Sequence, residues 1–388
     1  MDIVHLKRTK RLLAGHLWVF SNELFENPKK YAPGSLVEVR DKNENCLGTG
    51  YINPRSLIAV RLLSREKTVI DRSFLHAKIS NALRLRERLF GKADAFRMIF
   101  SEADYLPGLI VDKYGPCLVV QFLTLGIEAF SEDIIGVLDE IFAPETIVLR
   151  NDSRMRLLEG LPLGKEVVKG DLSRLPVIRE DGVVFEVNPL DGQKTGFFLD
   201  QRMNRTGLKR YIGKGAGLDL FSYSGGWAMH CASAGASVTC VDSSKRALEM
   251  ASRNAELNGF QDRVRCVEED VFAFLGSESA AASRTYDFVV FDPPAFVKSG
   301  RDIKEAVKAY RELNEQCMRL LKPGGILATS SCSYHLSKEL FVEMLNAASR
   351  KAQRDLRLLE MRSQSPDHPV LLSMPETEYL KCAFLLVD

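Results

Sequence analysis

The sequence predicts an α/β protein whose C-terminal half is a mostly parallel sheet with helices on both faces. From about residue 190 onward, short apolar strands alternate with helices, and this order of elements is typical of a parallel sheet. The chain has 388 residues, which at roughly 150 residues per domain suggests two or three domains. We therefore expect smaller domains before the α/β domain.

Residues 1–75 are expected to form a small β-rich domain. Apolar residues alternate or cluster between turn residues in three runs, which favours strands. These runs are Leu36–Arg40, Cys46–Tyr51 and Ile58–Leu63. The run Gly15–Ser21 is predicted to be a short helix or a turn.

Residues 76–188 are expected to form a second, mixed α/β domain of ordinary size. Helices are predicted over Lys78–Lys92 and Ile127–Phe142. The first of them is expected to carry three arginines on its surface, namely Arg84, Arg86 and Arg88. The expected strands are Phe96–Phe100, Leu109–Lys113, Cys117–Phe122, Thr146–Arg150 and Val183–Val187.

Residues 189–388 are expected to form the α/β domain itself. Its predicted strands are Gly217–Phe221, Ser237–Val241, Val264–Val267, Phe288–Phe291 and Ile326–Ser330. Helices are expected between them, including Ala228–Ala234 and Ser244–Leu257, the latter ended by Asn258 and Gly259. In sheets of this kind, ligands bind at the carboxyl ends of the strands. Functional residues are therefore sought where each strand ends.

The composition is that of a soluble globular protein, with 45% hydrophobic and 27% charged residues. No apolar run reaches the roughly 18–20 residues of a membrane span, and the N-terminus carries charge where a signal peptide would be apolar. A cytoplasmic location is expected. The eight cysteines include no CxxC pair, which argues against a zinc site, and no metal is expected.

Basic residues are concentrated at the N-terminus. Residues 1–75 hold 13 Lys/Arg and 8 Asp/Glu, a balance of +5, whereas the whole chain has a net charge of +2. This distribution indicates an anionic partner for the N-terminal domain, although a solvated surface would explain the charge as well.

A glycine turn and a series of acids point to a cofactor site. Gly225 and Gly226 follow the first strand of the α/β domain, where the lack of a Cβ lets the backbone approach a ligand. Asp219 lies at the end of that strand, and Asp242 ends the next strand, 23 positions later, where it could accept both hydroxyls of a ribose. Asp270 follows the third strand. The G-x-G-x-x-G pattern of a dinucleotide site is absent. The pattern favours a cofactor with a positive amino group and no phosphate, such as S-adenosylmethionine.

Two further residues carry the expected chemistry. Asp292 ends the fourth strand and is followed by two prolines, which fix the loop and leave a carboxylate and free carbonyls to face a planar base. Cys332 follows the fifth strand. A thiolate can add to carbon 6 of a pyrimidine and activate carbon 5 for methylation. A buried structural cysteine is the alternative, and it is the expected role of the other seven.

The segment Asp191–Arg202 precedes the first strand of the α/β domain and mixes polar and aromatic residues densely. One interpretation makes it a lid over the cofactor, with Lys194, Arg202 and Arg205 reaching acids or phosphates. The other makes it a capped helix that packs on the sheet through Phe197 and Phe198. The two interpretations are compatible.

Taken together, these motifs resemble one family, the bacterial large-subunit ribosomal RNA cytosine-C5 methyltransferases, which use S-adenosylmethionine. The resemblance covers nearly the whole chain. It is carried by Asp191–Arg202, Asp219–Gly226, Asp292–Phe296 and the Ser-Cys-Ser around Cys332. The N-terminal motif Gly48–Pro54 resembles the family's PUA domain, a small RNA-binding β-barrel; Glu102–Asp112 resembles its central domain, and Asp367–Pro369 with Glu378–Lys381 its C-terminal hairpin region.

The resemblance implies a class I methyltransferase Rossmann-like domain behind a PUA-like barrel and a small central α/β domain. It implies that Cys332 is the nucleophile and Asp292 the acid that contacts the base; Ala295 stands where a lysine would be expected. The implied cofactor contacts are Gln193, Thr195, Gly196, Phe198, Asp219, Phe221, Tyr223, Gly225, Asp242, Asp270, Asp292 and Pro293. The implied RNA contacts are Lys7, Arg8, Arg11, Lys194, Arg202 and Arg205.

Two other functions stay open from the sequence. Methylation of a purine nitrogen would also suit the Asp-Pro-Pro loop and would leave Cys332 without a role in the reaction. A non-catalytic RNA-binding assembly factor would use mainly the N-terminal domain. The expected partner is large-subunit ribosomal RNA, with no membrane, and a homodimer is left open.

Overall fold

A computed structural model describes residues 1–280, 284–296 and 303–388. The chain forms two compact units that interleave along the sequence. The first contains Met1–Ile178, Val187–Leu199 and Pro366–Thr377, and the second contains Arg179–Glu186, Asp200–Ser365 and Glu378–Asp388. The α/β class expected from the sequence is confirmed by this architecture.

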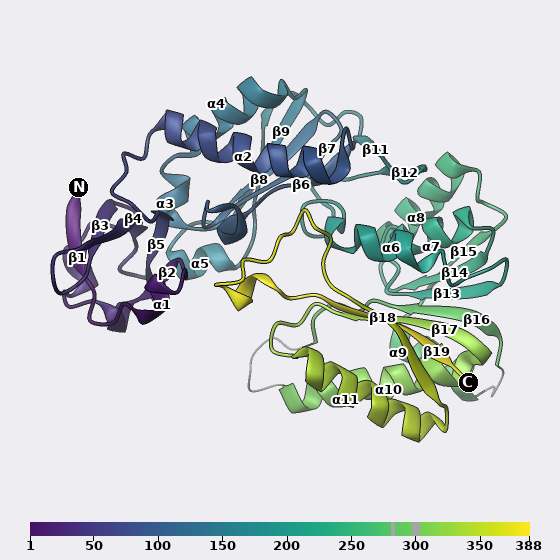
Figure 1. Ribbon diagram of the computed structural model, residues 1–388. Coiled ribbons are helices and arrows are strands. Elements are labelled where there is room, and N and C mark those ends of the chain that lie inside the picture. The colour runs from purple at the N-terminus through teal and green to yellow at the C-terminus, as the bar shows by residue number, and fades with distance from the viewer. Residues whose placement is uncertain (281–283, 297–302) are drawn as a thin grey trace. The chain divides into compact units, whose positions relative to one another are not determined.

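The N-terminal part of the first unit is a five-stranded sheet of order β1-β3-β4-β5-β2, coloured purple in Figure 1. Only β1 and β3 run parallel. Its elements are β1 (Asp2–His5), α1 (Lys10–Leu13), β2 (Trp18–Phe20), β3 (Leu36–Arg40), β4 (Cys46–Ile52) and β5 (Ile58–Ser64). Sheet packing is close at Gly50, where a Cβ would lie 2.3 Å from the Arg61 carbonyl oxygen.

The expected helix or turn over Gly15–Ser21 is wrong. Trp18–Phe20 form strand β2, in which Trp18 pairs with Arg61 and Val19 is buried in the core. The short helix lies earlier, over Lys10–Leu13. Three residues are too few for a periodic pattern to show, and this strand is fixed by pairing with β5, about 40 residues further along the chain.

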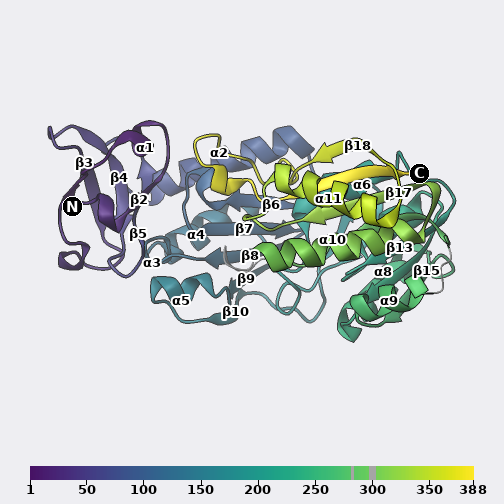
Figure 2. The same ribbon diagram turned by 90° about the horizontal axis from the view of Figure 1, so that it is seen from below.

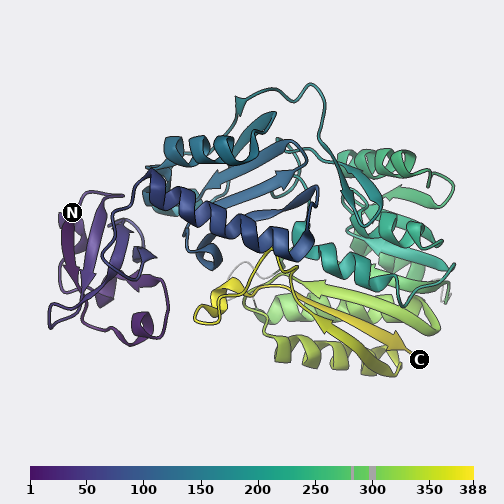
Figure 3. The same cartoon turned by 45° about the horizontal axis from the view of Figure 1, so that its top comes forward.

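The central part of the first unit is a second five-stranded sheet, of order β10-β9-β8-β7-β6. Helices α2 and α4 pack side by side against it (Figure 3). Helix α2 begins at Arg72 because the Asp71 side chain accepts the Phe74 amide. The elements are α2 (Arg72–Phe90), β6 (Ala95–Phe100), β7 (Leu109–Tyr114), β8 (Cys117–Phe122), α3 (Leu125–Glu128), α4 (Ser131–Phe142), β9 (Thr146–Asn151), α5 (Met155–Glu159) and β10 (Gly164–Lys169).

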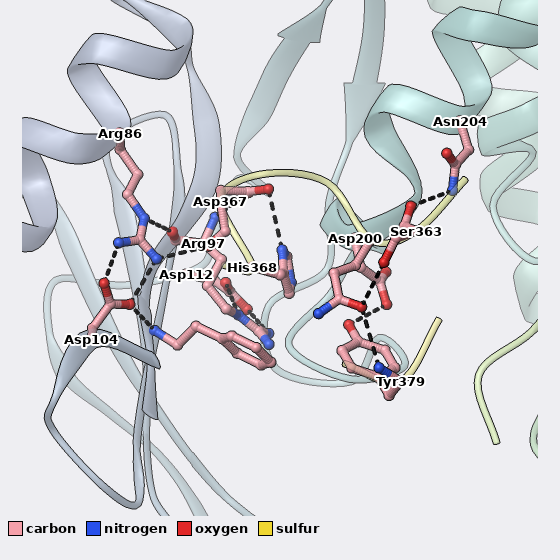
Figure 4. A network of polar contacts seen from close by, with 12 residues as sticks. Arg86, Arg97, Asp104, Asp112, Asp200, Asn204, Ser363, Asp367, His368 and Tyr379 are labelled. Carbon is pink, nitrogen blue, oxygen red and sulfur yellow. Dashed lines mark hydrogen bonds and ion pairs between the residues drawn. The ribbon is translucent and has the colours of Figure 1, made fainter. Parts of the chain in front are cut away.

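The expectation that Arg86 lies on the surface of its helix is wrong, because its side chain is 0% exposed. The Arg86 guanidinium binds both carboxylate oxygens of Asp104 and donates to the Asp367 carbonyl at 2.7 Å (Figure 4). Asp367 in turn accepts the Arg97 amide at 2.8 Å, and the Arg97 side chain pairs with Asp112. This network of ion pairs and hydrogen bonds anchors Pro366–Thr377 in the first unit.

The second unit is built on a seven-stranded sheet of order β15-β14-β13-β16-β17-β19-β18. The first five strands are parallel, as predicted. Strand β19 is antiparallel to both of its neighbours, β17 and β18. Helices α6, α7 and α8 cover one face of the sheet and α9, α10 and α11 the other (Figure 1), with α10 and α11 packed side by side (Figure 2).

The strands of this unit are β13 (Ala216–Leu220), β14 (Ser237–Asp242), β15 (Val264–Glu268), β16 (Tyr286–Phe291), β17 (Leu321–Ser331), β18 (Leu356–Arg362) and β19 (Lys381–Val387). The helices are α6 (Arg202–Leu208), α7 (Gly226–Ser233), α8 (Lys245–Asn258), α9 (Val271–Ala280), α10 (Ile303–Leu320) and α11 (Lys338–Ala352). A separate hairpin consists of β11 (Val177–Glu180) and β12 (Val183–Glu186).

Two hydrogen bonds within the second unit fix the chain just before and just after the segment Pro366–Thr377, which belongs to the first unit (Figure 4). The Tyr379 hydroxyl donates to Asp200 at 2.7 Å, and the Asn204 side-chain amide donates to the Ser363 carbonyl at 3.1 Å.

Among the described residues, none of the helices combines the length and the apolar character that crossing a membrane requires.

Candidate cofactor and catalytic site

The candidate site of the second unit lies at the carboxyl ends of the parallel strands. Strand β13 is central: the chain continues to β14 on one side of it, and β16 lies on the other. A ligand binds where the strand order changes in this way. Asp219 lies in β13 and Asp242 ends β14, while Asp292 and Cys332 immediately follow β16 and β17.

Asp219 is the most deeply buried acid of the site, with 1% of its surface exposed. One carboxylate oxygen, Oδ2, accepts the Ala228 amide at 3.1 Å. The other, Oδ1, is buried and has no hydrogen-bond partner among the residues that the structure describes. Burial raises the pKa of Asp219 well above its ordinary value, and the nearby Asp292 and Asp242 add to the shift. The unsatisfied oxygen fits the cationic amino group of S-adenosylmethionine.

The loop after β13 has an unusual backbone. Phe221 and Tyr223 have φ values of 58° and 49°, in the left-handed region that non-glycine residues rarely occupy. Gly225 has a φ of 76° and precedes the first residue of α7, and a Cβ there would lie 3.0 Å from the Met229 methyl carbon. Strain of this kind is kept at functional sites. The loop is therefore shaped to bring its backbone close to a ligand.

Asp242 holds this loop on β14. Its Oδ2 accepts the Tyr223 amide and its Oδ1 accepts the Ser244 amide, both at 2.9 Å. The side chain is half-buried, and each carboxylate oxygen has a second lone pair that a ribose hydroxyl could use. Asp270 is exposed, and its Oδ1 accepts the amides of Phe272 and Ala273 at the start of α9, at 3.0 and 3.1 Å.

Asp292 is oriented by two neutral donors that the sequence analysis did not identify. The Gln201 side-chain amide donates to Oδ1 at 2.9 Å, and the Trp227 indole N–H donates to Oδ2 at 3.0 Å. Both donors are buried, and Pro293 beside the acid is buried as well. Trp227 directly follows Gly225 and Gly226, and this position beside the glycine turn could have identified it as a site residue.

Cys332 is half-buried and follows the end of β17. The other seven cysteines were expected to be buried, and five of them are. Burial raises the pKa of Cys117 and Cys382 to about 12. The two exceptions are Cys46, which is exposed, and Cys266, which is half-buried. A hydrogen bond with Cys240 lowers the pKa of Cys266 to about 6.

The expected cofactor contacts of Asp191–Arg202 fall mostly in the first unit, which contains the segment Val187–Leu199. Thr195 is buried, and its hydroxyl is hydrogen-bonded to Asp112 and, at 2.9 Å, to the Tyr114 hydroxyl. Its side chain therefore links the segment to the central sheet. Gln193 and Lys194 are exposed, whereas Gly196 is buried and Phe198 half-buried.

Arg205 is withdrawn from the expected RNA contacts. Its guanidinium is 2% exposed and forms a two-pronged ion pair with Glu180, which also contacts His230. Burial raises the pKa of Glu180, but Arg205 and His230 outweigh that effect and hold it at about 2. Of the remaining candidates, Lys7, Arg8 and Lys194 are exposed and Arg11 and Arg202 half-buried.

The chain is similar to known proteins over both units. The PUA-like domain family matches residues 3–65, and the S-adenosylmethionine-dependent methyltransferase family matches residues 150–375. A protein of Pseudoalteromonas translucida named ribosomal RNA large subunit methyltransferase I is 37% identical over 380 residues, 96% of each chain. The protein of the same name from Cronobacter sakazakii is 35% identical over 380 residues, again 96% of each chain.

The chain belongs to the family of the ribosomal RNA large subunit methyltransferases I. The resemblance expected from the sequence is thereby confirmed, as is S-adenosylmethionine as the cofactor. The methyltransferase also shares its fold with a Streptococcus mutans protein provisionally described as a SAM-dependent methyltransferase, at a TM-score of 0.84 and 21% identity over the full length of both chains. Another solved methyltransferase structure, in complex with SAH, matches with a TM-score of 0.85, 21% identity and 99% coverage of each chain.

Proposed function

We propose that this methyltransferase transfers a methyl group to carbon 5 of a cytosine in large-subunit ribosomal RNA, through a covalent adduct with Cys332. The substrate class is taken from the printed names of its relatives, which act on ribosomal RNA of the large subunit. It agrees with the cytoplasmic location expected from the sequence. Carbon 5 is proposed as the methylated atom because Cys332 lies at the end of a strand, where its thiol could activate that carbon.

Cys332 is the first residue after β17, and β17 is hydrogen-bonded to β16, whose end carries Asp292. A nucleophile and a base-contacting acid thus follow adjacent strands at the same edge of the sheet. Among the described cysteines of the second unit, Cys266 is the other one that is not buried, but it lies within β15, paired with Cys240. The ends of the strands therefore offer Cys332 as the thiol for attack.

The reaction requires a cytosine that is out of the base stack, either flipped or already single-stranded. The Cys332 thiolate adds to carbon 6, and the electron density moves toward carbon 5. Asp292, held by Gln201 and Trp227, hydrogen-bonds the ring nitrogen or amino edge of the base and stabilises the charge that develops there. Bound S-adenosylmethionine supplies an electrophilic methyl group on a sulfonium. Loss of the carbon-5 proton then expels the Cys332 sulfur.

Residues of the second unit would hold the cofactor. Asp219 would bind its amino group through the unsatisfied Oδ1, and Asp242 its ribose hydroxyls. Asp270 and the backbone from Phe221 to Gly225 would complete the binding site. Gln193, Thr195, Gly196 and Phe198 stay cofactor contacts predicted from the sequence.

The test is to trap the adduct. RNA that carries 5-fluorocytosine has no removable proton at carbon 5, so the enzyme should stay attached after methyl transfer. We expect a cross-linked band on a denaturing gel for the wild type with S-adenosylmethionine, and no band for Cys332→Ala. Cys266→Ala, which removes the other partly exposed thiol of the unit, should keep the band. A band that persists in Cys332→Ala would identify another nucleophile. Methylation of normal RNA without any band would favour a purine nitrogen as the target.

A further inference from the structure

Lys381 is a buried lysine beside the proposed nucleophile. It is the first residue of β19, which runs antiparallel to β17 and pairs Lys381 with Ser331, the residue before Cys332. Its side chain is only 8% exposed. Lysine is among the side chains least often buried to this degree, because removing the ammonium from water is unfavourable. Its position therefore calls for an explanation.

The Lys381 ammonium is fixed on the other side of the cysteine as well. Its Nζ donates to the Ser333 carbonyl at 2.6 Å and to the Tyr379 carbonyl at 2.8 Å. Lys381 thus contacts the residue before Cys332 through the sheet and the residue after it through its side chain. A neutral donor such as an amide could link the same carbonyls without burying a charge. The contacts therefore fix the backbone at Cys332, but they do not require a lysine.

Electrostatic interaction with Cys332 explains why a lysine is buried at position 381. Burial lowers the pKa of Lys381 to about 8, while Cys332 and Glu378 oppose that shift. Attraction between an ammonium and a thiolate is mutual, so a cation at this position also favours the thiolate form of Cys332. Tyr310 of α10 also interacts with Cys332; burial raises the pKa of this tyrosine, which stays neutral near pH 7.

We propose that Lys381 is the residue that keeps Cys332 ready as a thiolate. This proposal rests on the proposed function in one respect, namely that Cys332 is the nucleophile. In the step we infer, the sulfur–hydrogen bond of Cys332 breaks, the proton passes to water, and the thiolate that remains is stabilised by the Lys381 ammonium. Two of the three N–H bonds of the ammonium are donated to the Ser333 and Tyr379 carbonyls. The products are a thiolate and a hydronium ion, with no change in total charge.

Thiol reactivity tests the proposal without RNA. We would alkylate the full-length protein with iodoacetamide between pH 6 and 10 and follow each cysteine peptide by mass spectrometry. In Lys381→Met, the pH profile of Cys332 should move upward by about one unit, which lowers its alkylation rate at pH 7 about tenfold. Lys381→Arg keeps a cation and should retain most of the wild-type rate at pH 7.

Two controls separate this role from a purely structural one. Cys46 and Cys266 are accessible thiols in the same molecules, and their profiles should be unchanged in both variants if the fold is intact. If the Cys332 profile of Lys381→Met equals that of the wild type, or if Lys381→Arg loses as much reactivity as Lys381→Met, the proposal is wrong. The adduct assay with Cys332→Ala tests the nucleophile separately, since it does not involve Lys381 and can fail or succeed independently of the alkylation profile.

Discussion

Two acids of this molecule, the buried Asp104 and the half-buried Asp292, accept hydrogen bonds from donors of different charge. In the first unit, the Asp104 carboxylate faces the Arg86 guanidinium, so that charge is matched by charge. In the second unit, the Asp292 carboxylate is held by the neutral donors Gln201 and Trp227. The first arrangement is electrostatically closed and stabilises a fold. The second uses uncharged donors to fix the orientation of a carboxylate at the edge of the sheet where we propose that the cofactor binds.

Breaking the closed network should give the largest effect on stability. Arg86→Met leaves the Asp104 carboxylate buried without its counter-charge, which we expect to lower the free energy of unfolding by about 3–5 kcal/mol. Urea denaturation would measure this loss. Arg84→Met, on the same helix but exposed, should change the stability by less than about 0.5 kcal/mol. Equal effects of the two substitutions would contradict the structural role of the network.

Removing one of the two hydrogen-bond donors to Asp292 should affect catalysis more than stability. Trp227→Phe keeps the packing but removes the N–H donor to Asp292, and we expect kcat to fall by a factor that corresponds to about 1–3 kcal/mol. The matched control is Trp18→Phe, because the Trp18 indole also donates to a carboxylate, that of Glu102, at 2.8 Å. It should leave the affinity for S-adenosylmethionine and kcat unchanged. A wild-type kcat in Trp227→Phe would show that this bond does not orient the acid.

Asp219 is a third acid, and one oxygen of its buried carboxylate has no hydrogen-bond partner among the described residues. Its folded-state pKa is raised, so the unfolded chain ionises first as pH rises, and stability is lost between the unfolded and the folded pKa. We therefore expect Asp219→Asn to stabilise the cofactor-free protein at pH 7, where the buried carboxylate is disfavoured, with no gain below pH 3. The same variant should bind S-adenosylmethionine more weakly by calorimetry. A variant that is both less stable and an equal binder would refute this role.

The smallest effect concerns the basic N-terminal domain, which we predict to bind the phosphate backbone of RNA. Lys7 and Arg8 are exposed, and replacing both by Ala should weaken RNA binding a few-fold and make the dependence of log Kd on log salt shallower, because fewer counterions are released. Lys42→Ala, in the β3–β4 turn of the same domain, serves as the control. An unchanged salt slope in the double variant would exclude these two residues from the RNA contact.

The sequence predicted the parts of the site that depend on local patterns. Asp219, Asp242 and Asp292 follow apolar strands, and the structure places them at one edge of the sheet. Residues whose partners lie far along the chain were missed or misplaced. Arg205 was expected to face RNA but pairs with Glu180, 25 positions earlier. Lys381 owes its role to a strand pairing with β17.

Arg86 shows where a usable signal was overlooked. The buried residues of α2 are Leu75, Ile79, Ala82 and Arg86. Their spacing of four, three and four positions defines one face of a helix. Arg86 therefore continues the apolar face, and its burial could have been inferred from periodicity. Its partners could not, because Asp367 is 281 positions away and no local pattern connects the two.

The reaction product shows whether the enzyme methylates carbon 5 of a cytosine through Cys332. Large-subunit ribosomal RNA from cells without the enzyme would be incubated with S-adenosylmethionine and either the wild type or Cys332→Ala, digested to nucleosides and analysed by mass spectrometry. We predict 5-methylcytidine with the wild type and none with Cys332→Ala. A methylated purine, or 5-methylcytidine at wild-type level with Cys332→Ala, would contradict the account.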